Sequence, residues 1–183
     1  MWFHASIIQL FRPFAIADEQ STPEMDGNFA RDILAASLNQ LKHLVIVFKY
    51  TFPRASCAIL WHIALLHVAN WALYDTANPE WRAYFLLCID SYTDLFVGFR
   101  ISGAIAKSLL SMALRLGVIE SSEARVLVEQ VYSSVIHHTG LERMGSGLVV
   151  DLNLALIDHT AAQLDTLCED FDNIQLEEFI ATE

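Results

Sequence analysis

Two aspartates with helical spacing are the first residues whose chemistry has to be considered. Asp90 and Asp94 lie one turn apart in a predicted helix, so their side chains face the same way. Carboxylates at this spacing hold metal ions in prenyl-transfer enzymes, but only where a second acidic cluster faces the first. The other acidic residues before position 144 are scattered along the chain. The pattern therefore favours a solvated helix face over a metal site.

The histidines and the one glycine-rich stretch give no catalytic pattern. His62 and His67 are separated by roughly 140° around a helix, so they cannot share one ion and are expected in the core or at a helix interface. The adjacent His137 and His138 fall at a predicted helix end, where a positive charge is favourable. Residues 145–147 (Gly-Ser-Gly) lack the spacing of a nucleophile elbow and the lysine of a phosphate loop. We expect a hinge there.

The tryptophans and cysteines leave one alternative open. Large rings on buried helices usually belong to the core, but Trp61, Trp71 and Trp81 are also compatible with a pocket for a small molecule. Three scattered cysteines are too few for a disulfide framework or a zinc site, and are expected to be small core residues: Cys57, Cys88 and Cys168. The sequence thus predicts no catalytic, cofactor-binding or metal-binding residue.

The composition indicates closely packed helices. Of the 183 residues, 54% are hydrophobic and 18% charged, with only 7 glycines and 4 prolines. The net charge of −11 is uneven, because residues 144–183 contain nine acidic residues and no lysine or arginine. An acidic segment repels a phosphate backbone, and no basic stripe precedes it. Direct binding of nucleic acid by these residues is not expected.

Apolar periodicity predicts an all-α fold, an irregular bundle of about seven helices. The predicted helices cover residues 2–14, 29–50, 55–74, 78–97, 99–116, 123–137 and 155–171. Gly117 is expected to end the fifth, and residues 148–156 are either a short extended piece or the entry to the last. Residues 55–74 lack charges over the length of a membrane span, but they include His62, His67 and Asn70, which are costly in lipid. A buried central helix is therefore favoured over a membrane anchor.

Three stretches together resemble a known family of regulators. Residues 3–14, which end in Arg12-Pro13-Phe14, are similar to a helix of the form Tyr-His-x-x-x-Ile-x-Leu-x-Arg-Pro-Phe. Residues 88–92 through 111–119 form the second stretch, and residues 149–155 with 177–179 (Glu-Glu-Phe) form the third. In this order they resemble the C-terminal regulatory region of fungal zinc binuclear-cluster transcription factors, the fungal-specific transcription factor domain.

The resemblance implies a nuclear protein that controls transcription by RNA polymerase II without catalysis. It implies contacts with protein partners or with a second copy, and a possible small-molecule effector. No membrane contact is expected, because residues 55–74 are favoured as a buried helix. In this family zinc and DNA are bound by a separate N-terminal module of six cysteines, which this chain does not contain, so no cofactor is expected here. Because the Arg-Pro-Phe helix is normally internal, Met1 is expected to be the start of a fragment.

The resemblance and the acidic segment together suggest two regions. Residues 1–168 are expected to form the helical regulatory domain, and residues 169–183 an acidic-hydrophobic tail. Acidic and apolar residues alternate in the tail, which is typical of activation segments that fold on a partner, and also of an amphipathic helix packed on its own domain. Two other functions remain as alternatives: a helical metal-dependent enzyme using Asp90 and Asp94, and a membrane-associated protein anchored by residues 55–74.

Overall fold

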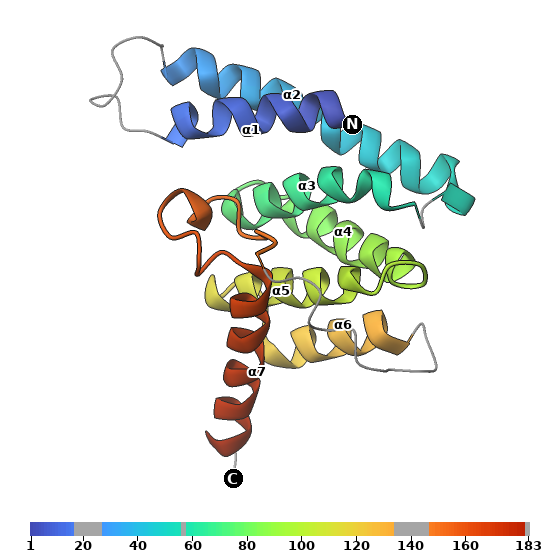
Figure 1. The fold of residues 1–183 in the computed structure, drawn as a ribbon, viewed down its shortest axis with the longest axis vertical. Coiled ribbons are helices and arrows are strands. Elements are labelled where there is room, and N and C mark those ends of the chain that lie inside the picture. The colour runs from blue at the N-terminus through green and yellow to red at the C-terminus, as the bar shows by residue number, and fades with distance from the viewer. Residues whose placement is uncertain (17–26, 56–57, 134–146, 182–183) are drawn as a thin grey trace.

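A computed structural model describes residues 1–16, 27–55, 58–133 and 147–181. Seven α-helices and three short 3-10 turns, without a β-strand, make up this described part (Figure 1). The helices are α1 (Trp2–Ile16), α2 (Gly27–Thr51), α3 (His62–Tyr74), α4 (Trp81–Phe96), α5 (Ile101–Arg115), α6 (Ser121–Ser133) and α7 (Leu164–Ala181). The all-α prediction is confirmed.

The helices stack in the order of the chain. α1 and α2 pair at one end of the molecule, α3 packs beneath them, and α4, α5 and α6 follow (Figure 1). α7 runs across this stack and packs on α5 (Figure 1). α1 therefore contacts α3 at one end of the stack, whereas α7 contacts α5 nearer the other end.

α3 is the central helix that the uncharged stretch predicted, but it is shorter. Every residue from 64 to 70 is buried, which explains why this segment contains no charged side chain. The predicted single helix over 55–74 is wrong, because Pro53–Ala55 and Ile59–Trp61 form 3-10 turns and α3 begins only at His62. In the ranges that the structure describes, no helix is long and apolar enough to cross a membrane.

α5 ends where the sequence predicts, just before Gly117. Gly117 has φ 67°, a left-handed conformation in which a side chain is unfavourable. Its N–H bonds the Leu114 carbonyl at 2.9 Å, and the Val118 N–H bonds the Ala113 carbonyl at 3.1 Å. These two bonds satisfy carbonyl groups that the helix end leaves free. The predicted C-terminal glycine of this helix is confirmed.

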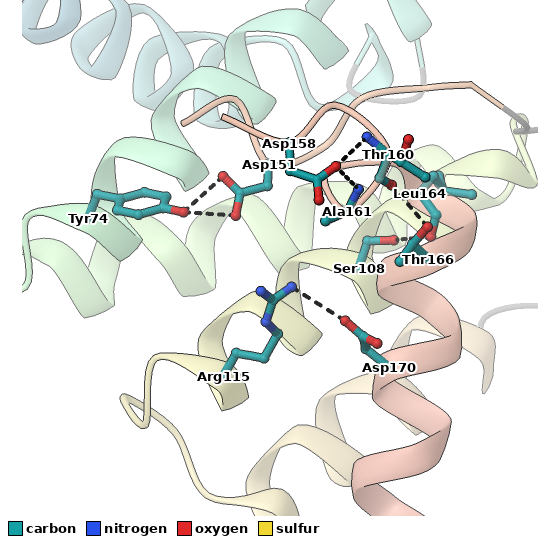
Figure 2. Close-up of polar contacts among 10 residues, drawn as sticks. All are labelled: Tyr74, Ser108, Arg115, Asp151, Asp158, Thr160, Ala161, Leu164, Thr166 and Asp170. Carbon is teal, nitrogen blue, oxygen red and sulfur yellow. Dashed lines mark hydrogen bonds and ion pairs between the residues drawn. The ribbon is translucent and has the colours of Figure 1, made fainter. Parts of the chain in front are cut away.

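The last helix begins later than predicted. Residues 155–171 were expected to be helical, but Leu154–Leu156 is a 3-10 turn and α7 starts at Leu164. The reason is local: the Asp158 carboxylate accepts the N–H groups of Thr160 and Ala161, both at 3.0 Å (Figure 2). Such side-chain bonds replace helical ones. An isolated antiparallel bridge between Val149 and Gln163 then closes residues 148–163 into a loop, here called the 148–163 loop.

α7 packs on its own domain. Leu167 and Phe171 are buried against the core, and Asp172 forms an ion pair of 2.7 Å with Lys107 of α5. Arg115 of α5 pairs with Asp170 at 3.4 Å (Figure 2). For this part of the tail the structure shows the packed amphipathic helix. The expected boundary between residues 168 and 169 lies inside the continuous α7.

Candidate functional site

Asp90 and Asp94 form an ion-paired cluster with a lysine. The Lys49 ammonium of α2 lies 2.7 Å from a carboxylate oxygen of each aspartate, so it occupies the position between them. These bonds raise the pKa of Lys49 despite the opposing effect of its burial. Within the described ranges, no three His, Cys, Asp or Glu side chains are grouped to hold a metal ion. The two carboxylates therefore link α4 to α2.

The predicted histidines and tryptophans are separated from one another. His62 Nδ1 lies 3.1 Å from the Tyr92 hydroxyl, whereas His67 is fully buried and faces Arg12. The tryptophans pack against different rings: Trp61 against Phe48, Trp71 against Tyr84 and Trp81 against Phe85. They do not form a common cage. Cys88 is buried and Cys168 is half-buried, while Cys57, His137, His138, Gly145 and Ser146 lie outside the described residues.

A pocket of about 190 Å³ opens between α1, α2 and α3. Most of its wall is apolar, and one tryptophan, Trp71, lines it. The polar part of the wall is formed by Arg12, Tyr74, Asp75 and Asn153. The remaining lining residues are apolar side chains of the first two helices: Ile8, Ala15, Leu34 and Leu38. We call this the Arg12 pocket.

Arg12 joins three parts of the fold at the pocket. It comes from α1, and one nitrogen of its guanidinium donates to the Asn153 amide oxygen of the 148–163 loop at 2.8 Å. Another guanidinium nitrogen lies 3.4 Å from Nδ1 of His67 in α3. Arg12 is only 9% exposed. Its hydrogen-bond partners are neutral, and the anion Asp151 acts on its buried charge through space and without an ion pair, an arrangement that leaves the burial of the charge costly.

The electrostatics of the pocket follow from this burial. Burial lowers the pKa of Arg12 to about 10, opposed by the charge of Asp151, so the guanidinium is protonated at neutral pH. Burial, together with the nearby Arg12 cation, lowers the pKa of His67 to about 3, so the imidazole is neutral. Its Nε2 atom is buried and makes no hydrogen bond within the described part of the chain. Arg12 makes no ion pair with any carboxylate of the described residues.

The 148–163 loop is fixed to α3 by two side chains. Asn70, fully buried, donates to the Val150 carbonyl at 2.9 Å and accepts the Leu152 N–H at 2.8 Å. The Tyr74 hydroxyl donates to the Asp151 carboxylate, with oxygen–oxygen distances of 2.8 and 2.9 Å (Figure 2). Burial and this bond raise the pKa of Tyr74. The loop is therefore held close to the pocket before it enters α7.

The residue types and spacings in the sequence do not indicate the polar members of this site. Arg12 and Asn153 are 141 positions apart, and neither belongs to a spacing pattern that indicates a ligand. The signal that could have found them lies in the stretches that carry the family resemblance. Arg12 is in the Arg-Pro-Phe stretch and Asn153 in residues 149–155, and the fold brings the two stretches into contact.

The comparisons with known proteins do not assign a family. No protein-family model matches the chain. No curated protein matches it. No solved structure matches it either.

Proposed function

We propose that the chain is a non-catalytic regulatory domain that senses a small molecule in the Arg12 pocket. In line with the resemblance, we place it in a nuclear transcription factor of the fungal zinc-cluster type, with DNA and zinc bound by a module outside this chain. The observation that carries the proposal is the position of Arg12. This buried cation lines a mostly apolar pocket and bonds to both the 148–163 loop and α3.

The contacts suggest how occupancy of the pocket reaches the rest of the domain. A ligand that draws the Arg12 guanidinium toward itself weakens the bond between Arg12 and Asn153. The loop that contains Asn153 continues into α7, the helix with the acidic residues. A ligand shifts the population of two arrangements only by its difference in affinity for them. The Arg12–Asn153 bond provides that difference, because it competes with the ligand for the same cation.

The pairing of Asp90 and Asp94 with Lys49 supports a regulatory over an enzymatic role. A metal ion between these two carboxylates would have to displace a lysine ammonium 2.7 Å from each of them. The same pairing explains the aspartates as a link between α2 and α4. It leaves the Arg12 pocket as the better supported site.

A reporter assay tests the proposed function. The chain is fused to a heterologous DNA-binding module, and transcription from a reporter is compared with that of the module alone. A pocket-filling substitution, Leu34→Trp, is expected to change the output at least twofold, because the indole occupies the space of the effector. Ala36→Trp, on an exposed position of the same helix, is the matched control and is expected to match the unsubstituted fusion.

Two results contradict the proposal. One is an output of the unsubstituted fusion equal to that of the DNA-binding module alone. The other is equal output from Leu34→Trp and Ala36→Trp fusions when circular dichroism shows that both purified chains keep their helix content. Either result would show that the pocket does not control transcription.

A further inference from the structure

The chemistry of the Arg12 pocket points to one class of ligand. We infer that it binds a small monocarboxylate whose apolar part is about the size of a benzene ring. The inference rests on the proposed function, since it names the effector of the same pocket. Three features of the pocket support it: its size, the state of Arg12 and the charges around Arg12.

The size of the pocket limits the ligand to a few carbon atoms. The volume is about 190 Å³. An apolar cavity of about 150 Å³ in another protein binds benzene. The additional volume here suits one small polar group. The side chains of Ile8, Leu34, Leu38 and Trp71 provide the apolar contact for the ring or for a branched aliphatic chain.

The state of Arg12 selects an anion as the polar group. The guanidinium is protonated and buried, and its hydrogen-bond contacts within the described residues are with the neutral side chains of Asn153 and His67. Two contacts use only part of its five N–H donors. A carboxylate fits the planar guanidinium with two parallel hydrogen bonds and compensates the buried charge. A neutral amide or alcohol does not compensate that charge.

The surrounding charges select a single negative charge. Asp75 lines the same pocket, and the charge of Asp151 already acts on Arg12 through space. A dianion such as phosphate would bring two charges beside these carboxylates in a mostly apolar pocket. A monocarboxylate balances the Arg12 cation with one charge. Its apolar part then faces α2, away from the polar end of the pocket that Arg12 and Asn153 form.

Titration of the full chain with benzoate tests the inference. Benzamide is the neutral control, because it has the same ring and nearly the same shape without the charge. Binding is followed by nuclear magnetic resonance through the indole N–H of Trp71, which lines the pocket. We expect saturable shifts with a Kd on the order of 1 mM for benzoate, and binding of benzamide at least tenfold weaker. Equal affinities for benzoate and benzamide, or the absence of saturable shifts with benzoate, would overturn the inference.

Two substitutions separate the charge from the cavity. Arg12→Met is expected to reduce benzoate binding to the level of benzamide, whereas Arg125→Met, an arginine on α6 bonded to Gln175, leaves it unchanged. If Arg12→Met does not fold, Leu34→Trp provides the test with the arginine intact. It is expected to abolish binding of both molecules, and Ala36→Trp to preserve it. Unchanged benzoate binding in a folded Arg12→Met or Leu34→Trp chain contradicts the assignment.

The outcomes distinguish this inference from the proposed function. If benzoate does not bind but Leu34→Trp still changes reporter output, the pocket regulates through another ligand and the carboxylate assignment is wrong. If benzoate binds with the expected preference but reporter output is insensitive to Leu34→Trp, the pocket binds carboxylates without controlling transcription.

Discussion

Asn70→Ala tests how strongly the 148–163 loop is fixed to α3. The amide of Asn70 is fully buried and bonds the Val150 carbonyl and the Leu152 N–H. The substitution leaves both loop groups without partners, at about 1.5 kcal/mol for each. The better helix propensity of alanine offsets about 0.5 kcal/mol of this loss of stability. The free energy of unfolding should therefore fall by about 2.5 kcal/mol.

The assay is urea unfolding followed by circular dichroism, with a thermal scan beside it. For a chain of 183 residues the expected loss corresponds to a decrease in Tm of roughly 5–10 °C. Asn39→Ala is the matched control, since Asn39 is exposed on α2, and its effect should stay within about 0.5 kcal/mol. Asn70→Asp should cost more than Asn70→Ala, because a carboxylate would face the Val150 carbonyl.

A decrease of less than about 1 kcal/mol in the free energy of unfolding of Asn70→Ala would refute this role of Asn70. A loss equal to that of Asn39→Ala would show that the two bonds to the loop are replaced by bonds to water at little cost. In that case the loop is not held by Asn70, and coupling between the pocket and α7 would lose one of its supports.

Three further predictions concern single positions. Burial lowers the pKa of His67 to about 3, so the folded state favours the neutral imidazole. The neutral imidazole therefore contributes its full stability above pH 6.5, and this contribution is lost as the pH falls toward 3. In His67→Gln, the free energy of unfolding in urea should depend less on pH between these values, by up to about 1.4 kcal/mol per pH unit. Gly117→Ala should lower stability by about 1 kcal/mol because φ is 67°, with a smaller loss for Gly117→Asn in the same measurement. Gly103→Ala should lower it by about 1–3 kcal/mol, since the new Cβ would lie 2.7 Å from Cε2 of Phe96; an unchanged Tm would show that this ring moves aside easily.

Most of the helical architecture could be predicted from the sequence, because the spacing of apolar residues indicates which face of a helix is buried. α2, α5 and the glycine at position 117 follow from patterns within a few residues of one another. The error over 55–74 has a physical reason. The absence of charged side chains indicates that a segment is buried. It does not distinguish an α-helix from the 3-10 turns at Pro53–Ala55 and Ile59–Trp61.

The site could not be predicted in the same way, because it depends on contacts between distant segments. The bonds from Arg12 to Asn153 and from Asn70 to Val150 each join residues that are 80 or more positions apart. The start of α7 combines a local signal, the bonds that Asp158 accepts, with a bond from the N–H of Leu164 to the Leu148 carbonyl, 16 positions away. Periodicity carries no information about these pairs.

The distance along the chain between Arg12 and Asn153 has a consequence for synthesis on the ribosome. A chain grows by about 5–20 residues per second, so the 141 residues between them take roughly 7–28 s to add. Closing a loop of this length also costs on the order of 4 kcal/mol in chain entropy. During this time α1 can pair with α2, but the guanidinium has no loop amide to bond. A nascent chain therefore acquires its polar pocket wall only when almost all of the domain has been synthesised.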